Sequence, residues 1–471
     1  IFKHFYFNKI KEYYRGKNSE LIKEYAQFFE IHSISECIKN KMKYIIKYNN
    51  DDEGKKIEIK NFSDLKIFDN KIDCSNIKQG HLATCYFLEA LSTLSNYGQL
   101  LYQLFPKEEI NDEGYYELCL YTQGEWCKVL IDDYFLFKKR ESEDDPLEFL
   151  FTQPAKGCLY SCFLEKAYAK INGSYCDINY GYQCKAFTAL TGCDTMSFSN
   201  ERINNALITQ LKIFLNKGYL LSGASLGHAY SILRNQNDYF VVRNPWSVLR
   251  ENDILMQKKY KQINKLKFDI DILIGEFKLR EKDFKQFFDG GIDVGFCLFG
   301  TRVYKIKLDQ IKTIKDDKQF YFYFETYGVT NMIITLHSYN NDETAFNDMD
   351  EYSAKIELIS EDDKEKEEKN LYTFNDLKKK TLQEQNSFND FNIENVIYKG
   401  KHLGKIKLYE KFSNYENKVL TIIINKNIDI KFLGYLDKKP EKTQIEKYSS
   451  DIQYTFAGLF IDEPGLSTLY L

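Results

Sequence analysis

A cysteine stands where a polar turn meets an apolar helical pattern in "QGHLATCYFLEALSTL", which runs from Gln79 to Leu94. The reactive form of cysteine is the thiolate, and the positive potential at a helix N-terminus favours that form. Cys85 is therefore a candidate nucleophile, and the turn at Gly80 brings the side-chain amide of Gln79 back toward its thiol. Most cysteines are small buried packing groups, so this motif alone also suits a structural role.

A base for this thiol must come from one of only six histidines. His228 lies in "GASLGHAYSILRNQNDYFVVRNPWS", where "HAYSILR" and "DYFVVRN" predict two strands joined by the polar turn "NQND". A hairpin centred on Gln236 places Asn244 opposite His228, close enough for the amide to orient the imidazole. A register shifted by one residue would turn the two side chains to opposite faces.

The order Cys85, His228, Asn244 and the separation of 143 positions from Cys85 to His228 are typical of papain-like proteases. His228 would take the thiol proton and return it to the leaving amine, while Asn244 fixes the tautomer and orientation of the ring. Gln79 and the backbone N–H of Cys85 would stabilise the oxyanion of the tetrahedral intermediate. Taken one at a time, each partner also suits a structural role. His228 could be a buried core histidine, Asn244 could begin a turn, and Gln79 could cap a helix. Their coincidence with Cys85 favours the catalytic interpretation.

The composition sets the broad class of the protein. A chain of 471 residues with 43% hydrophobic and 28% charged residues predicts two or three globular domains. The net charge of −4 indicates no nucleic-acid or anionic-membrane partner, and no apolar run of about 18 residues predicts a transmembrane segment. The 11 cysteines contain no CxxC pair, which indicates reduced thiols in an intracellular, cytoplasmic protein. The first residue is Ile1 rather than Met, which is compatible with a longer natural chain that includes a targeting peptide.

The pattern of apolar residues divides the chain into three parts. Residues 1–62 have helical spacing and predict a helical N-terminal extension without chemistry of its own. Residues 63–300 mix helices and strands, including a helix that starts at Cys85 and keeps apolar residues on one face as far as Leu101. Within residues 301–471, runs such as "QFYFYFETY" and "VLTIIIN" predict an antiparallel β-sandwich, with "EDDKEKEEKN" (361–370) as a solvated loop.

These motifs together resemble the calpain family of cysteine proteases. "QGHLATCYFLEAL" is similar to the family's Cys motif, and "GEWCKVLIDDYF", "FLEKAYAKINGSY", "GHAYSIL", "VVRNPWS" and "GEFKLREKDFKQFF" follow in the family's order over roughly residues 63–299. The resemblance implies an α+β fold with a two-lobed papain-like core. One lobe (63–195) carries Cys85, the other (196–300) carries His228 and Asn244, and an antiparallel β-sandwich (301–471) follows. Trp246 matches a family tryptophan that packs by the catalytic cleft and screens the His–Asn pair.

The chain departs from the family pattern at positions that bind calcium in calcium-dependent calpains. Asn76 and Cys158 stand where the first lobe offers carboxylates, and Ile274 replaces an acidic residue of the second lobe, where Glu276 is the one remaining candidate ligand. Calcium takes six to eight oxygen ligands, so these changes predict weak or absent calcium binding and no required cofactor.

The residues beside the nucleophile also differ from the family, with Ala83-Thr84 in place of Gly-Asp and Tyr86 in place of Trp. The sequence predicts an intracellular cysteine endopeptidase that hydrolyses polypeptides through an acyl-thioester on Cys85. The alternative is a calpain-like domain with weak or no activity that serves as a structural or docking module in a larger assembly. A transglutaminase uses the same nucleophile but usually orients its histidine with Asp, so Asn244 disfavours it.

Overall fold

The computed structural model describes residues 29–50, 54–107, 109–122, 125–193, 195–247, 253 and 275–295, followed by eleven strands between Thr301 and Tyr470. The chain divides into two compact units. The first contains Ile1–Leu120 and Cys127–Cys297, and the second contains Tyr121–Trp126 and Leu298–Leu471. Within the described residues, no helix combines the length and apolar character needed to cross a bilayer.

The first unit begins with the elements that we call the first lobe. Its helices are α3 (Ile34–Lys39), α4 (Cys85–Leu94), α5 (Gly98–Gln103), α6 (Tyr160–Asn172) and α7 (Gln183–Thr191). Its strands are β1 (Phe29–Ser33), β2 (Lys43–Asn50), β3 (Gly54–Asn61), β4 (Ile77–Lys78), β7 (Tyr134–Lys138), β8 (Leu147–Glu148) and β9 (Gln153–Pro154). They form small sheets, β1 with β7, β3 with β2 and β8, and β4 with β9. β5 (Tyr115–Thr122) pairs with β6 (Glu125–Asp132).

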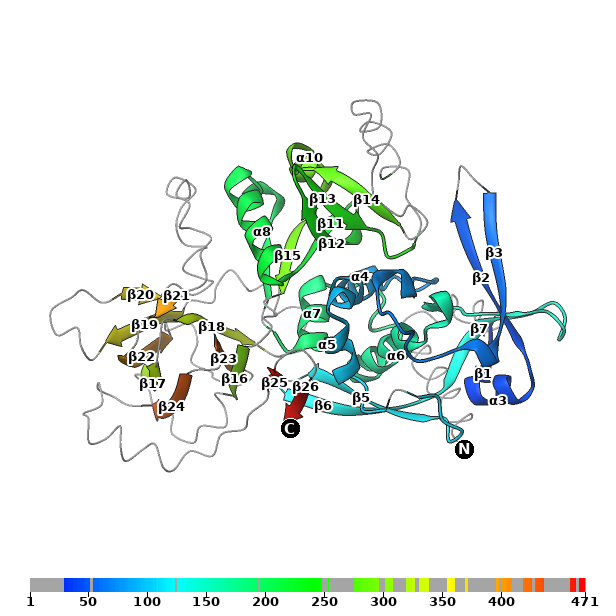
Figure 1. Cartoon of the computed structure of the whole chain (residues 1–471), viewed down its shortest axis with the longest axis horizontal. Helices are drawn as coiled ribbons and strands as arrows, with labels where there is room; N and C mark the ends of the chain where they lie inside the picture. Colours follow the sequence, from blue (N-terminus) through cyan, green and yellow to red (C-terminus); the bar gives the residue numbers. More distant parts are fainter. Residues whose placement is uncertain are drawn as a thin grey trace. The chain divides into compact units, whose positions relative to one another are not determined.

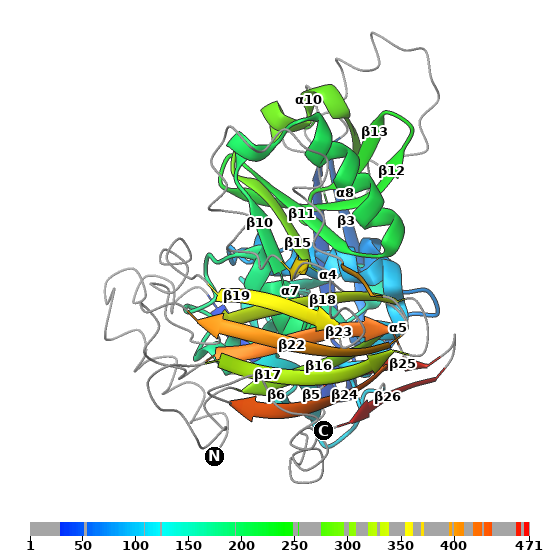
Figure 2. The same cartoon turned by 90° about the vertical axis from the view of Figure 1, so that its left-hand side faces the viewer.

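The described part of the second lobe contains a six-stranded antiparallel sheet and the helices α8 and α10. The strand order is β10 (Thr195–Phe198), β15 (Gly291–Gly295), β11 (Leu220–Ser225), β12 (His228–Gln236), β13 (Tyr239–Arg243) and β14 (Glu276–Arg280). The helices are α8 (Asn205–Lys217) and α10 (Glu281–Phe287). α8 lies against β11 and β12 (Figure 2) and buries only one face, in agreement with its amphipathic sequence.

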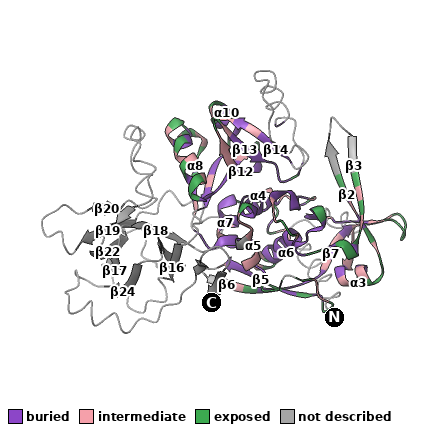
Figure 3. Ribbon diagram, in the orientation of Figure 1, coloured by how far each residue is buried: buried purple, intermediate pink, exposed green. Residues whose placement is uncertain are grey.

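Helix α4 occupies the centre of the first unit. It packs against β11 and β12 of the second lobe and against α5, α6 and α7 of the first (Figure 1). Every residue from Tyr86 to Leu94 is buried, whereas α8 keeps an exposed outer face (Figure 3). A helix that is buried all round holds its first residue rigidly, and that residue is Cys85.

Two predictions of secondary structure are wrong and two are confirmed. Residues 29–61, predicted to be helical, form three strands and the short helix α3, because Tyr44 and Ile46 alternate as buried residues with the period of a strand. The helix that begins at Cys85 ends at Leu94, and Leu101 lies on α5 instead. The run "SCFLEKAYAKING" (161–173) predicts a helix with a glycine stop, which is confirmed as α6. The run "WCKVLIDDYFLF" (126–137) predicts a strand and a turn; the strand is confirmed as β6, and the residues from Tyr134 onward form a further strand, β7. Residues 1–28 lie outside the described residues.

The second unit consists of strands in its described part. One sheet has the order β16 (Thr301–Lys307), β23 (Lys418–Asn425), β18 (Thr330–Ser338), β21 (Asn395–Ile397). Another has the order β20 (Lys369–Leu371), β19 (Ala354–Ser360), β22 (Gly400–Leu408), β17 (Gln319–Thr326), β24 (Ile428–Tyr435). β25 (Gly458–Asp462) pairs with β26 (Leu466–Tyr470). The predicted antiparallel strands are confirmed, whereas their packing as a sandwich stays a prediction. Most of the charged run 361–370 lies outside the described residues.

Candidate active site

Cys85 is the first residue of α4, so its thiol lies at the N-terminal end of that helix. The preceding residue, Thr84, is fully buried and donates a hydrogen bond of 2.5 Å to a carboxyl oxygen of Glu165 on α6. The other carboxyl oxygen of Glu165 accepts from the backbone N–H of Thr152 at 3.0 Å. A buried carboxyl group therefore anchors the start of α4 and fixes the backbone of the nucleophile.

The environment of the Cys85 sulfur favours the thiol. Burial raises the pKa of Cys85 above its ordinary value, and the carboxyl of Glu89, one helical turn along α4, acts in the same direction. Hydrogen bonds from the backbone N–H groups of Ala229 and Tyr86 lower the pKa but do not offset the burial. The prediction that the helix terminus favours the thiolate is therefore wrong for the protein without substrate, and Cys85 needs a base to remove its proton. The Ala229 contact places the sulfur beside the residue that follows His228.

His228 begins β12, directly after the two-residue turn Leu226-Gly227 that joins β11 to β12. The turn residues have φ values of 50° and 70°, as a tight hairpin turn requires. Ser225 pairs with His228 across this turn. The backbone of the imidazole is therefore fixed, and His228 is only 6% exposed.

The hairpin from β12 to β13 does not have the predicted register. Its turn consists of Asn237 and Asp238, and Gln236 is the last residue of β12 rather than the centre of the turn. The prediction that His228 lies directly opposite Asn244 is therefore wrong. The polar run "NQND" located the turn, but its composition did not show which two residues form it.

A β-bulge brings Asn244 to the His228 side of the hairpin nonetheless. The bulge inserts one residue into β12, and beyond it Ser231 pairs with Arg243. One step further along the hairpin from this pair, Asn244 lies beside Tyr230. Tyr230 points to the same face of β12 as His228, because the two are separated by two positions. Without the inserted residue, the alternation of the strand would turn Asn244 to the opposite face.

The side chains of His228 and Asn244 form a hydrogen bond of 2.9 Å between Nε2 and Oδ1. The backbone N–H of Trp246 donates to the same Oδ1 at 3.0 Å, which identifies this atom as the amide oxygen. Because an amide oxygen only accepts, Nε2 of His228 carries the hydrogen. The second ring nitrogen, Nδ1, is then the one that can take a proton.

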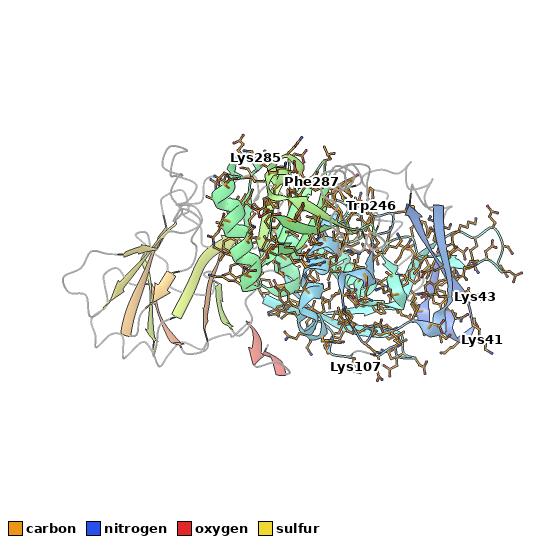
Figure 4. The ribbon with its side chains drawn as sticks, turned by 45° about the horizontal axis from the view of Figure 1, so that its top comes forward. Lys41, Lys43, Lys107, Trp246, Lys285 and Phe287 are labelled. Atoms are coloured by element: carbon orange, nitrogen blue, oxygen red, sulfur yellow. The ribbon has the colours of Figure 1, made fainter. Side chains whose placement is uncertain are left out.

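Two aromatic rings contact the imidazole of His228. The centroid of the Trp246 ring lies 4.7 Å from that of His228, and the Tyr230 ring lies at 4.9 Å and nearly perpendicular, at 86°. Trp246 is 38% exposed and lies where the green strands of the sheet meet the blue and cyan elements of the first lobe (Figure 4). The structure thus brings Trp246 together with the His228–Asn244 pair.

Asp253 belongs to this cluster, although the sequence did not reveal it. Asn244 donates from Nδ2 to Asp253 Oδ2 at 3.1 Å, and the Tyr230 hydroxyl donates to Asp253 Oδ1 at 3.1 Å. Asp253 lies nine positions after Asn244, a spacing that no helix or strand period connects, so no pattern in the sequence pairs the two. Tyr230 could have been found, because it lies two residues after His228 on a predicted strand and therefore shares its face.

Gln79 lies where the two lobes meet. Its backbone N–H donates to the carbonyl of Pro245 at 3.0 Å, and its side-chain Nε2 donates to the carbonyl of Leu82 at 2.7 Å. An amide nitrogen carries two hydrogens, so the second is left for an oxyanion. The adjacent Gly80 is required, because a Cβ there would lie 1.8 Å from the carbonyl oxygen of Phe151. The oxyanion role of Gln79 stays a prediction.

The residues that depart from the family pattern beside Cys85 have partners of their own. The backbone N–H of Ala83 donates to the side chain of Asn179 at 3.0 Å, and the Ala83 carbonyl accepts from the backbone N–H of Tyr180 at 3.1 Å. The hydroxyl of Tyr86 donates to the carbonyl of Ile178 at 3.1 Å. Segment 178–180 therefore supports the turn that leads into α4.

The candidate calcium positions contain neutral or already engaged groups. Asn76 and Cys158 touch each other, with Nδ2 3.2 Å from Sγ, and burial raises the pKa of Cys158 to about 12. The carboxylate of Glu276 accepts from Arg234 at 3.0 Å and 3.4 Å, and from the Cys74 thiol at 3.7 Å. Position 274 lies outside the described residues. In the described ranges, no three His, Cys, Asp or Glu side chains are grouped to hold a metal ion.

A group of buried hydrogen bonds, which we call the seam cluster, joins the two lobes. The fully buried guanidinium of Arg243 donates to the carbonyl of Ile77 at 2.5 Å and to the hydroxyl of Ser92 at 2.7 Å, both in the first lobe. It also donates to the hydroxyl of Ser247 at 2.9 Å, and Ser247 donates to the Ile77 carbonyl at 2.8 Å. These four residues hold the nucleophile and the base in one body.

Comparison with known proteins agrees with this geometry. The family described as "Calpain family cysteine protease" matches residues 53–289, just over half of the chain. The calpain-type cysteine protease DEK1 of Zea mays is 32% identical over 206 residues, which cover 38% of this chain and 9% of the maize protein. A calpain of Schistosoma mansoni is 29% identical over 265 residues, 46% of this chain and 33% of that protein. Calpain-8 of Mus musculus is 29% identical over 201 residues, 36% of this chain and 28% of that protein.

The chain thus spans a third or less of the length of these three relatives. The family match covers the first lobe from β3 onward and most of the second lobe, including Cys85, His228 and Asn244. The chain belongs to the calpain family of cysteine proteases.

Proposed function

We propose that this protein is a cysteine endopeptidase that hydrolyses peptide bonds through an acyl-thioester on Cys85. The observation that carries the proposal is the hydrogen bond between His228 and Asn244. It holds the imidazole in the tautomer that accepts a proton at Nδ1, and the sulfur of Cys85 contacts the N–H of the next residue, Ala229. Burial raises the pKa of the Cys85 thiol, so the sulfur needs an adjacent base to become a nucleophile, and His228 is the candidate for that base.

The mechanism follows from these positions. His228 takes the thiol proton as the sulfur attacks the scissile carbonyl, and the backbone N–H of Cys85 and the Gln79 amide stabilise the oxyanion. The imidazolium then gives its proton to the leaving amine, which leaves an acyl-thioester on Cys85. A water molecule that His228 deprotonates hydrolyses the thioester and restores the thiol.

Exposed apolar side chains near these residues suit a polypeptide substrate. Trp246 is 38% exposed, Leu226, two residues before His228, is 56% exposed, and Tyr180, bonded to the turn before Cys85, is 73% exposed. Apolar side chains left in water beside a reactive group favour an extended peptide with apolar residues of its own. The same proposal includes a cytoplasmic location and a β-sandwich formed by the two larger sheets of the second unit.

The first prediction concerns the nucleophile. A peptidyl chloromethyl ketone is expected to alkylate Cys85 in preference to the half-buried thiols of Cys127 and Cys176, because the proposed base His228 can take the proton of the Cys85 thiol. Mass-spectrometric peptide mapping of the full chain measures the site. His228→Ala is expected to slow the labelling of Cys85 by about 100-fold. Equal labelling of the three thiols in the wild type would favour the structural or docking module instead.

The second prediction concerns calcium. We expect calcium to bind weakly or not at all, and a chelator to leave peptide hydrolysis unchanged. The positions of Asn76 and Cys158 bring no charge, Glu276 already binds Arg234, and the seam cluster joins the lobes directly. A ligand shifts a conformational equilibrium only by its differential affinity for the two states. Calorimetric titration of the full chain, with hydrolysis followed in parallel, tests this. Saturable micromolar binding that switches on cleavage would contradict it.

A further inference from the structure

Asp253 is a buried carboxyl group next to the His228–Asn244 pair. It is fully buried, as Asn244 is, and each of its two oxygens accepts a hydrogen bond of 3.1 Å from a described residue. The donors are the side-chain amide of Asn244 and the hydroxyl of Tyr230. Because both oxygens accept, the arrangement suits an ionised carboxylate, which has no hydrogen to donate.

The contacts form a closed circuit around the imidazole. His228 bonds to Asn244 at 2.9 Å, Asn244 bonds to Asp253, and Asp253 bonds to Tyr230. The ring of Tyr230 then packs at 86° against the imidazole with 4.9 Å between centroids. Each member contacts two others of the circuit, so the orientation of the Asn244 amide is set by Asp253 as well as by the histidine.

This orientation decides the chemistry of the base. An amide could meet Nε2 of His228 with either its oxygen or its NH2 group. If the NH2 group faced the ring, Nε2 would have to accept and the ring hydrogen would move to Nδ1, the atom that must take the thiol proton. A carboxylate accepts only, so Asp253 draws the NH2 group of Asn244 to itself and turns the oxygen to His228. The Trp246 N–H acts in the same sense.

We propose that Asp253 is a positioning residue, which acts through Asn244 to hold His228 in the tautomer with an unprotonated Nδ1. Its negative charge also stabilises the imidazolium that forms when Cys85 reacts, because charges in a buried site are poorly screened. The inference rests on the proposed function, since an unprotonated Nδ1 matters only if His228 serves as a base. The charge and the geometry of Asp253 can be separated by two substitutions.

The kinetic test uses the full chain and a fluorogenic peptide. Asp253→Ala is expected to lower kcat by about 10- to 100-fold with KM nearly unchanged, because a hydrogen bond to a charged group is lost. Asp253→Asn keeps an oxygen for Asn244 and presents its NH2 group to the Tyr230 oxygen, so its kcat is expected to lie between those of wild type and Asp253→Ala. Asp238→Ala, at an exposed acid in the turn of the same hairpin, is the matched control and keeps the wild-type kcat.

The spectroscopic test does not require activity. In ¹⁵N-histidine-labelled full chain, with the His228 signals assigned by His228→Gln, the wild type is expected to show a hydrogen on Nε2, and Asp253→Ala a mixture of both tautomers. If Asp253→Ala does not fold, Asp253→Asn gives the same comparison through a partial shift. Unchanged His228 signals in the folded variants would overturn the inference. A wild type that hydrolyses no peptide, but whose His228 signals respond to Asp253, would overturn the proposed function and leave the positioning role intact.

Discussion

Replacing Cys85 by alanine is expected to abolish peptide hydrolysis, with a fall in kcat of at least about 10⁴-fold. The variant removes the atom that forms the acyl-thioester and leaves His228 and Asn244 in place. The residual rate then comes only from substrate binding and from the oxyanion donors. Hydrolysis of a fluorogenic peptide by the purified full chain, at saturating substrate, measures the loss.

Cys127→Ala is the matched control for this loss. Cys127 is also a half-buried cysteine, but it lies on β6, and its substitution is expected to leave kcat at the wild-type value. Thermal unfolding of both variants should match that of the wild type, which separates chemistry from folding. Full activity in Cys85→Ala would mean that another group carries the reaction, or that a contaminating peptidase does.

Replacing Arg243 by methionine is expected to lower the free energy of unfolding by about 3–5 kcal/mol, because three buried hydrogen bonds from a charged donor are lost. Methionine fills a similar volume but offers no donor to the Ile77 carbonyl or to the hydroxyls of Ser92 and Ser247, so each of these buried groups loses one of its hydrogen-bond partners. Each kcal/mol corresponds to a change in Tm of about 2–4 °C for a unit of this size, so a fall of roughly 10 °C is expected by calorimetry.

Arg234→Met provides the comparison on the same sheet. The Arg234 side chain is 40% exposed and pairs with Glu276 at 3.0 Å, and such half-exposed pairs contribute about 1 kcal/mol or less. The two substitutions remove the same charge, so the difference between them isolates burial at the seam. Equal, small losses of stability in both variants would show that the lobes are held together by their apolar contacts and not by Arg243.

The candidate catalytic residues were predictable from sequence because each has a local signature. Cys85 precedes an apolar helical pattern, His228 follows a turn, and Asn244 ends a β-branched run, and the structure brings all three to one region. The helix α6 with its glycine stop was readable for the same reason, since Gly173 adopts a φ of 114° at the end of an amphipathic helix. Local signals of this kind depend on a few consecutive residues.

The remaining features depend on tertiary contacts. The bulge in β12 is not marked by glycine or proline, so the register of the hairpin could not be derived from the turn composition. The contact of Asp253 with Asn244 depends on the path of the chain after Pro245, which no periodicity defines. The raised pKa of Cys85 arises from burial, and the isolated helix motif predicts the opposite direction. The strands of residues 29–61 were missed because their apolar residues also fit a helical spacing.

Arg243 and Asn244 are neighbours in the chain, yet one belongs to the seam cluster and the other to the base. Consecutive residues of an extended chain point to opposite sides, so a single peptide bond links the joint between the lobes to the imidazole. A change that relaxes this joint also displaces the amide that orients the ring. Under the proposed function, a substitution at this dipeptide is therefore expected to change heat tolerance and turnover together.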